Sequence, residues 1–471
     1  MDLGKKVQIC KVMQIVLSFL GTMAAAAFSP LFMFFQNAGE AHFSDVAPTM
    51  LMFMATGIVL YAIALLITRN PSKTGIISVV FLLVFLNYAH IESAIQLLLP
   101  SLRYWHILPV TIFLLLHIGW FIQKKLSVEF SEIIANVISA VLVVMIFLNG
   151  FLAIPSMATR IRAEKEAKHL AKETVASDKT MPNFYFILFD EFSTIPFMQK
   201  HFNYDNSKLV TKLENMGFAV SNTGHNDHYS TSTVTTNMFN LDYVVNFEDT
   251  EEDKFARRSG NIVFPMLKNA GYSIQCVSGG PFYGLENVTN TGTENATTMG
   301  GDTAHTLLMD MTVFYPIANP YYPERPRMIL DSIDYMKKPD NFDASNKFVL
   351  FHVECPHPPF YFDADGNLLG HVTSDRNDKN NYLNQYIFSS NEMLKISDSI
   401  TKNDPDAIIW LLSDHGEREN DIPPEDMCNF FNAVYYQGKK LDIEGLSGVN
   451  TFRLILNELL GTNYEALPLP N

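Results

Sequence analysis

The chain has 471 residues, of which 48% are hydrophobic, and its formal net charge is −15 at pH 7. This length allows a large domain plus a second part, and the acidic balance argues against nucleic acid as a partner, because phosphate backbones are bound by basic surfaces. Almost all long apolar runs precede Pro155, whereas acidic residues are concentrated in the second half.

Apolar stretches fill the first third of the chain, and several approach the ~20 residues that span a bilayer. They are Val12–Phe35, Met50–Ile67, Gly75–Ala89, Tyr104–Phe121 and Ile133–Ile154. Polar residues interrupt the third stretch, so we expect it to span to about Ala89 and to continue as an interfacial helix that ends at Pro100. The pattern predicts an α-helical transmembrane domain of about five spans over residues 1–155.

The distribution of basic residues predicts how these spans are oriented. Lysines precede the first stretch, and basic pairs follow the second and the fourth; these residues are Lys5, Lys6, Lys11, Arg69, Lys73, Lys124 and Lys125. By the positive-inside rule the N-terminus is cytoplasmic and the chain after Pro155 is outside. We therefore predict a multi-pass protein of the plasma (inner) membrane. A cleaved signal peptide is not expected, because the first stretch is long and others follow it. Few charges lie within the spans, which argues against a transporter.

The composition changes twice after the membrane domain. Residues 156–180 are rich in Ala, Lys, Arg and Glu, which predicts a helical linker. Short β-rich runs then alternate with helical stretches, which predicts an extracytoplasmic α/β domain over residues 181–471 with a largely parallel sheet flanked by helices. The expected strands are Phe184–Phe189, Phe218–Val220, Ile274–Val277, Phe348–His352 and Ile408–Leu412, and the expected helices are Ser207–Met216, Pro326–Lys338 and Asn384–Lys402.

Three cysteines lie in this second half, at Cys276, Cys355 and Cys428. One disulfide is possible among them, and the third thiol would be left over. The chain contains no CxxC spacing, so a zinc-thiolate site has no support.

Chemically active residues follow three of the expected strands. Asp190 and Glu191 follow the first, His352 lies at the end of the fourth, and Asp414 and His415 follow the fifth. In parallel sheets the ligand site lies beyond the carboxyl ends of the strands. A lone carboxylate there is commonly a helix cap, but Asp190 together with Asp414 and His415 predicts a site for a divalent cation.

A cluster of hydroxyl groups is the second chemical feature. Every residue of Ser230–Thr236 except Val234 is Ser or Thr. Such segments usually form turns or caps. Here the segment can begin a helix, whose N-terminal amides attract an anion, and a hydroxyl bound to a divalent cation can ionise and attack phosphorus. The cluster itself does not reveal which hydroxyl attacks.

The loop after the fourth strand carries a second histidine, His357, followed by two prolines that stiffen the chain. A lone histidine is more often structural. Because His352 and His357 flank this rigid loop, we expect them to bind an anionic substrate or to protonate a leaving group. His225 and His228 are further candidates for lining the site.

The chain resembles the membrane-anchored branch of the alkaline phosphatase/sulfatase superfamily, which includes lipoteichoic acid synthases and phosphoethanolamine transferases. The resemblance covers nearly the whole chain and is carried by Pro182–Glu191, Tyr229–Tyr243, His352–Phe360 and Ser413–Gly416. It implies metal binding by Asp190, Asp414, His415 and the hydroxyl nucleophile, and substrate contact by His357. Those relatives have Glu where this chain has Asp190, so Glu191 is the alternative ligand, although the strand register favours Asp190.

The resemblance narrows the choice of nucleophile. The segment is about one residue shorter than in the relatives: counting from Tyr229 selects Ser232, whereas counting back from Asn240 selects Thr231. We predict Thr231, as nucleophile and as a metal ligand, with Ser232 and Thr233 as the alternatives.

The resemblance also implies an activity. It is the transfer or hydrolysis of a phosphate-ester group, such as phosphoglycerol or phosphoethanolamine, from a membrane phospholipid onto a cell-surface glycan or glycolipid, through a phosphothreonine intermediate and with zinc or manganese. A sulfatase acting on surface glycans is one alternative, but the segments around Cys276 and Cys355 lack the C/S-x-P-x-R motif of type I sulfatases. A non-catalytic membrane scaffold with a degenerate hydrolase domain is the other alternative.

Overall fold

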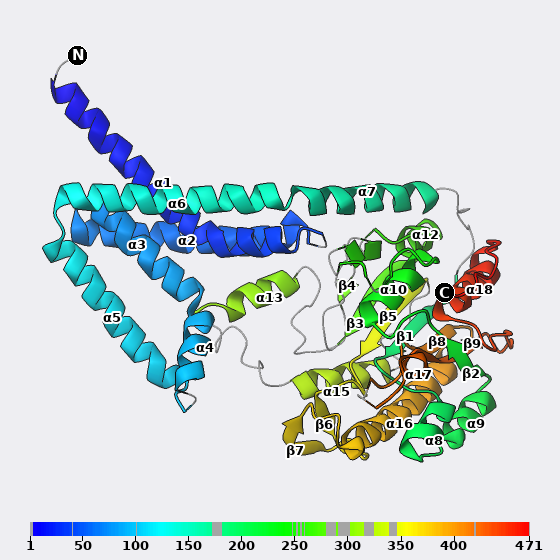
Figure 1. Ribbon diagram of the computed structural model, residues 1–471. Coiled ribbons are helices and arrows are strands. Elements are labelled where there is room, and N and C mark those ends of the chain that lie inside the picture. Colours follow the sequence, from blue (N-terminus) through cyan, green and yellow to red (C-terminus); the bar gives the residue numbers. More distant parts are fainter. Residues whose placement is uncertain are drawn as a thin grey trace. The chain divides into compact units, whose positions relative to one another are not determined.

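The computed structural model describes residues 3–39, 41–99, 101–171, 181–246, 248–250, 253–254, 257–258, 260–278, 289–290, 302–314, 325–338, 346–418 and 421–470. The chain divides into two compact units (Figure 1). Unit 1 comprises Met1–Met157 with Gly301–Tyr322, and unit 2 comprises Ala158–Gly300 with Pro323–Asn471.

Unit 1 is a bundle of long apolar helices. They are α1 (Leu3–Gln36), α2 (Phe43–Thr68), α3 (Pro71–Leu86), α4 (Tyr88–Leu98), α5 (Tyr104–Lys125) and α6 (Val128–Leu152). Among the residues that the structure describes, four helices are long and apolar enough to cross a membrane, and α3 with α4 makes a fifth span if this pair, bent by 66°, counts as one. The predicted helical membrane domain is therefore confirmed, and so is the break in its third stretch.

Small residues allow the central helix α1 to pack closely against its neighbours α2, α3 and α6. A Cβ atom on Gly21 of α1 would lie only 1.9 Å from Ser139 Oγ of α6, so the two helices approach at a glycine. Nearby, the hydroxyl groups of Ser18 and Tyr61 are 2.7 Å apart and link α1 to α2. Small side chains and interhelical hydrogen bonds are the usual means of association for helices in lipid, where apolar burial gives little driving force.

A helix from much later in the chain, α13 (Asp302–Asp310), also belongs to unit 1. His305 Nδ1 lies 2.8 Å from Thr49 Oγ1 near the start of α2, and Leu308 is fully buried in the apolar core of the helical bundle. These residues lie within the range 181–471 that the sequence analysis assigned to the catalytic domain. They pack on the apolar helices because α13 presents its own apolar side chain to them.

The chain after α13 continues this contact. The backbone N–H of Val313 donates to Phe85 O at 2.7 Å, and the Tyr104 hydroxyl donates to Val313 O at 2.6 Å. Phe85 is near the end of α3 and Tyr104 is the first residue of α5. The N–H of Ala89 in α4 also donates to Met311 O at 3.1 Å, so the segment 302–314 is joined by hydrogen bonds to four helices of the bundle.

Unit 2 is built on a seven-stranded sheet with strand order β2-β9-β8-β1-β5-β3-β4. The strands are β1 (Phe184–Phe189), β2 (Ala219–His225), β3 (Ser273–Ser278), β4 (Thr289–Asn290), β5 (Lys347–Val353), β8 (Ile408–Ser413) and β9 (Asn429–Tyr436). All neighbouring pairs are parallel except those that β9 makes with β2 and β8. This is the largely parallel sheet that the sequence predicts. A separate hairpin is formed by β6 (Phe360–Phe362) and β7 (Leu368–Thr373).

Helices cover both faces of the sheet (Figure 1). Tyr185, Ile187 and Phe189 of β1 pack in the core on one face with α8, α9, α15 and α16, whereas Phe184, Phe186 and Leu188 pack on the other face with α10, α12 and α18. These helices are α8 (Ile195–Phe202), α9 (Ser207–Asn215), α10 (Thr231–Asn240), α12 (Val263–Asn269), α15 (Arg325–Met336), α16 (Lys379–Asn403) and α18 (Gly448–Leu460). Burial on both faces explains why β1 is continuously apolar.

The predicted strands appear as β1, β2, β3, β5 and β8, and the predicted helices as α9, α15 and α16. Strand β9 and the hairpin β6–β7 were not expected. Within the linker range, α7 (Ile154–Ala171) is helical, and residues 172–180 lie outside the described part. The thiols of Cys276, Cys355 and Cys428 are all free, so the possible disulfide is not formed.

Candidate metal centre

The central strands β1 and β8 bring two carboxylates to the same edge of the sheet. These strands are parallel and Phe189 is paired with Ser413, so the next residues, Asp190 and Asp414, leave the sheet side by side. Ligand atoms of Asp190, Asp414 and His415 all lie within 4.8 Å of one another, and the three residues are buried. The structure thus brings together the three residues that the strand ends suggested.

Hydrogen bonds from the backbone orient the two residues of the β8 end. Asp414 Oδ1 accepts from the backbone N–H of Glu191 at 3.0 Å and from that of His415 at 2.9 Å. His415 Nδ1 donates to Gly416 O at 2.8 Å, which leaves Nε2 as the lone-pair nitrogen, 3.2 Å from Asp414 Oδ2. A neutral imidazole of this tautomer is the form that binds a metal ion.

Two oxygens of this cluster have no hydrogen-bond partner among the described residues, namely Asp190 Oδ1 and Asp414 Oδ2, and both are buried. Burial raises the pKa of Asp414. Burial also opposes ionisation of Asp190, but a hydrogen bond from His352 and the nearby imidazoles hold the pKa of Asp190 well below its ordinary value. Buried polar atoms without partners are rare, and two carboxylates with one imidazole nitrogen form a ligand set that suits a divalent cation.

Thr231 is the first residue of α10 and is the cluster's hydroxyl neighbour. Its Oγ1 lies 3.4 Å from His415 Nε2. The Ser232 hydroxyl instead lies 3.1 Å from the Ser230 hydroxyl. Thr233 is fully buried and, two residues further along, is displaced by about 200° around the helix from Thr231. Of the three candidate hydroxyls, Thr231 is thus the one with a contact to a candidate metal ligand.

The two histidines around the proline loop have different neighbours. His352 of β5 donates from Nε2 to Asp190 Oδ2 at 3.2 Å. His357 accepts at Nε2 a hydrogen bond from Arg418 Nη2 at 3.2 Å, and its Nδ1 is hydrogen-bonded to Pro358 O. His352 therefore contacts a candidate metal ligand directly, whereas His357 lies beside a guanidinium group.

Glu191, the alternative metal ligand, is fully buried among arginines. Arg376 binds its carboxylate with two hydrogen bonds of 3.0 Å, Nη1 to Oε2 and Nη2 to Oε1, and Arg418 Nε donates to Oε1. Arg376 also donates to Glu417 Oε1 at 2.6 Å. Burial, with Glu191 as a negative neighbour, raises the pKa of Glu417 to about 8. The contacts of Glu191 favour Asp190 as the ligand from this strand end.

His228 and His225 precede α10. The Nε2 atom of His228 lies 3.8 Å from the carboxylate of Asp227, and His225 is the last residue of β2. Burial lowers the pKa of His225.

Three residues close to this site were not found from the sequence: Asn226, Arg376 and Arg418. Asn226 Nδ2 donates to Asp414 O at 2.7 Å. Arg418 stands close to the Asp414–His415 pair in the sequence, so proximity to that motif was a usable signal. Arg376 lies in a polar loop between β7 and α16, and nothing in its local sequence indicates a role.

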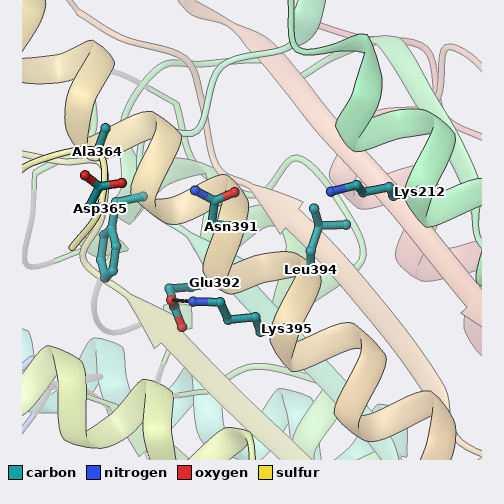
Figure 2. Close-up of a pocket in the computed structure, with 8 residues that line it drawn as sticks. Lys212, Ala364, Asp365, Asn391, Glu392, Leu394 and Lys395 are labelled. Carbon is teal, nitrogen blue, oxygen red and sulfur yellow. Dashed lines mark hydrogen bonds and ion pairs between the residues drawn. The ribbon is translucent and has the colours of Figure 1, made fainter.

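A pocket of about 340 Å³ lies between α9, α16 and the turn after β6 (Figure 2). Its charged lining residues include Lys212, Asp365, Glu392 and Lys395, and Lys395 forms an ion pair of 2.7 Å with Glu392. No residue of the Asp190 cluster lines it, so this pocket is separate from the candidate metal centre.

No family model and no curated protein matches the sequence. Solved structures that it resembles include the periplasmic domain of EptC from Escherichia coli in complex with Zn, with 13% identity, a TM-score of 0.40, and coverage of 61% of this chain and 84% of that one. The integral membrane phosphoethanolamine transferase EptA from Neisseria meningitidis gives 13% identity, a TM-score of 0.38, and coverage of 94% and 95%. The lipoteichoic acid synthase LtaP from Listeria monocytogenes gives 11% identity, a TM-score of 0.37, and coverage of 65% and 80%. These are the two classes of protein that the sequence motifs resemble, but identities and TM-scores this low do not carry an activity to this chain.

Proposed function

We propose that this chain is a metal-dependent phosphotransferase that moves a phosphate-ester group from a membrane phospholipid to a cell-surface glycan or glycolipid. The observation that carries the proposal is the position of Thr231. Its hydroxyl is at the N-terminus of α10 and 3.4 Å from His415 Nε2. His415 clusters with two buried carboxylates, and Asp190 Oδ1 and Asp414 Oδ2 have no hydrogen-bond partner among the described residues. A nucleophilic hydroxyl, an anion-attracting helix end and a metal ligand set thus meet in one place.

Asp190, Asp414 and His415 would hold the cation, with the Thr231 oxygen as a further ligand. Their mixed oxygen and nitrogen donors suit zinc or manganese. When bound, the cation lowers the pKa of the hydroxyl and offsets negative charge on the phosphate.

The transfer has two steps, both on Thr231. In the first, the Thr231 oxygen attacks phosphorus, the bond between phosphorus and the lipid alcohol breaks, and the proton of the hydroxyl ends on the departing diacylglycerol. In the second, an acceptor hydroxyl attacks phosphorus, the bond between phosphorus and the Thr231 oxygen breaks, and the proton of the acceptor hydroxyl returns to Thr231. Water as acceptor turns the same sequence into hydrolysis. The free amides at the start of α10 stabilise the equatorial oxygens of phosphorus in both steps.

His357 and Arg418 are the proposed contacts for substrate. The planar guanidinium group of Arg418 matches the geometry of phosphate oxygens. His357 Nε2 accepts a hydrogen bond from Arg418, so His357 can assist the leaving alcohol only after Arg418 has turned to the phosphate. We therefore expect these two residues to act together.

The proposed site of action is the outer face of the plasma membrane. The charge pattern of the loops puts the start of α2, the end of α3 and the start of α5 outside. Thr49, Phe85 and Tyr104 lie near these three helix ends, and all of them are hydrogen-bonded to residues of the segment 302–314. A segment from the second half of the chain thus reaches the helix ends that the charge rule makes external, which supports the same orientation.

Intact-mass analysis of the full chain in nanodiscs of phosphatidylglycerol or phosphatidylethanolamine tests the proposal. We expect an adduct of phosphoglycerol or phosphoethanolamine mass that maps to Thr231, is abolished by EDTA and is absent in Thr231→Ala. Ser232→Ala is the matched control and keeps the adduct. The proposal is wrong if neither an adduct nor a bound metal appears with any lipid. Release of sulfate from sulfated glycans would instead indicate a sulfatase, and a metal-free protein whose Thr231→Ala variant has no phenotype would indicate a scaffold.

A further inference from the structure

We propose that Arg376 is a positioning residue for the metal centre: its ion pair with Glu191 fixes the backbone turn that holds Asp414 in place. This inference rests on the metal centre of the proposed function. The hydrogen bonds of Arg376 go to Glu191 and Glu417, and not to Asp190, Asp414 or His415. Glu191, the second carboxylate after β1, then has a role other than metal binding.

The backbone at Glu191 is in the left-handed region, with φ of 62°. This conformation is unfavourable for a residue with a side chain, because Cβ comes close to the following carbonyl oxygen. Such a residue persists only where its surroundings hold it. The left-handed turn has a direct consequence, since it aims the N–H of Glu191 at Asp414 Oδ1, 3.0 Å away.

Three contacts hold Glu191 in this conformation. Arg376 donates two hydrogen bonds to the Glu191 carboxylate, and Arg418 donates one to the same carboxylate. The Tyr382 hydroxyl donates to the backbone carbonyl, Glu191 O, at 2.6 Å. The residue is fully buried. The side chain and the backbone carbonyl of Glu191 are thus held by different partners. With both held, the N–H of Glu191 stays directed at Asp414 Oδ1.

Arg376 also connects the two strand ends that supply the ligands. One side of its guanidinium group binds Glu191, next to Asp190, and Nη1 also binds Glu417, two residues after His415. The Glu417 N–H in turn donates to Ser193 Oγ at 3.0 Å. A planar fork with several donors can join two carboxylates in this way, whereas the single ammonium group of lysine cannot reproduce the paired bonds.

The inference predicts that loss of Arg376 weakens metal binding without removing a ligand. We expect Arg376→Ala in the full chain to bind Zn²⁺ about 10-fold more weakly than wild type. This is the lower end of the loss that follows removal of a direct partner of a metal ligand, because Arg376 acts through Glu191 and not on a ligand itself. Arg376→Lys should fall between the two. The measurement is the dissociation constant for Zn²⁺ alone, from competition with a chromogenic chelator, with the thermal midpoint recorded for every variant.

Arg453→Ala is the matched control. Arg453 is half-buried in the same unit, and its guanidinium group donates to two backbone carbonyls, those of Leu241 and Glu465. Its loss should lower the thermal midpoint but leave the Zn²⁺ dissociation constant unchanged, so stability and metal affinity are separated.

Substitutions of Glu191 test the backbone step itself. Glycine adopts the left-handed conformation without the Cβ penalty, so Glu191→Gly should bind Zn²⁺ about five-fold more tightly than Glu191→Ala. If Glu191→Gly and Glu191→Ala bind Zn²⁺ equally tightly, the backbone conformation at this position does not govern metal affinity, and the inference is overturned.

Two other results would overturn it as well. If Arg376→Ala and Arg376→Lys bind Zn²⁺ as tightly as wild type, Arg376 has no positioning role, while the metal centre and the proposed function stand. If wild type itself binds neither Zn²⁺ nor Mn²⁺, the metal centre fails, and the positioning role fails with it.

Discussion

Removing the charge of Asp414 should stabilise the metal-free protein. The ligand oxygens of Asp190 and Asp414 lie within 4.8 Å of each other in a buried site, and two unit charges at that separation repel by about 3.5 kcal/mol at an effective dielectric constant of about 20. The imidazoles of His352 and His415 offset part of this repulsion. We therefore expect Asp414→Asn to raise the free energy of unfolding of metal-free unit 2 by about 1–3 kcal/mol. The asparagine oxygen can still accept the hydrogen bonds that the N–H groups of Glu191 and His415 give to Oδ1.

Zinc should reverse the order of stability of wild type and Asp414→Asn. At a free concentration of about 1,000 times the dissociation constant, a ligand that binds only the folded state stabilises it by about 4.1 kcal/mol, which exceeds the gain of about 1–3 kcal/mol expected for the variant without metal. Wild type should gain this amount, whereas Asp414→Asn, which has lost a ligand, should gain almost nothing. The variant is then the more stable protein in EDTA and the less stable one in zinc.

Tryptophan fluorescence can follow this transition in unit 2 alone. The chain has three tryptophans, and Trp410, in β8, is fully buried in the core of unit 2. Replacing Trp105 and Trp120 of unit 1 by phenylalanine leaves Trp410 as the reporter. Unfolding of the full chain in detergent is then measured in EDTA and in zinc.

Asp404→Asn is the control for this experiment. Asp404 accepts hydrogen bonds from Asn183 at 2.8 Å and from the Tyr185 hydroxyl at 2.9 Å, and it precedes β8 at the strand end opposite to Asp414. Its substitution should destabilise the protein equally with and without zinc. The reasoning is refuted if Asp414→Asn destabilises the metal-free protein and still responds to zinc as wild type does, because Asp190 and Asp414 would then share no ion.

Three further predictions concern other parts of the chain. A Cβ on Gly416 would lie 1.8 Å from Nδ2 of Asn429, whose amide is fixed by hydrogen bonds, so Gly416→Ala should lower the free energy of unfolding by about 1–3 kcal/mol in urea denaturation. Burial raises the pKa of Cys428 to about 11; its thiol is therefore protonated below that pH, and alkylation followed by mass spectrometry should accelerate about ten-fold per pH unit between pH 8 and 10. Leu308→Asp puts a charge into the core of unit 1, and hydrogen exchange of residues 302–314 should increase, whereas Leu307→Asp, at a side chain that is exposed, should leave it unchanged.

The parallel sheet, and the proximity of Asp190, Asp414 and His415 at its edge, could be predicted because both depend on local sequence. Strands buried on both faces read as continuous apolar runs, and Asp190, Asp414 and His415 directly follow two of them. Any parallel arrangement of these strands puts the three residues at one edge, so the prediction did not need the strand order. That β1 and β8 are direct neighbours, with Phe189 opposite Ser413, comes from the structure alone.

The surroundings of Glu191 could not be predicted in the same way. Arg376 is 185 residues from Glu191 in the sequence, and its loop reads as an ordinary polar turn. Both consecutive carboxylates after the strand were candidate ligands, with the strand register favouring Asp190, and the arginine contacts and left-handed backbone of Glu191 come from the structure alone. The position of α13 was missed for a related reason, because a short amphipathic helix does not specify which apolar surface it covers.

The choice among the hydroxyls depends on helix geometry, which residue counting does not include. Counting from the two ends of the motif gives Thr231 or Ser232. The structure begins α10 at Thr231, so successive residues are displaced by about 100° around its axis. With Thr231 Oγ1 near His415, a reaction at Ser232 would require about a quarter turn of the helix, and Thr233 is buried on a different side. Thr236 and Thr235 hydrogen-bond through their hydroxyls to the carbonyls of Ser232 and Thr231, each at 2.6 Å, and hold this first turn in register. A covalent adduct on Ser232 would therefore mean that the first turn of α10 unwinds during the reaction, and this is the structural change to look for if Thr231→Ala retains activity.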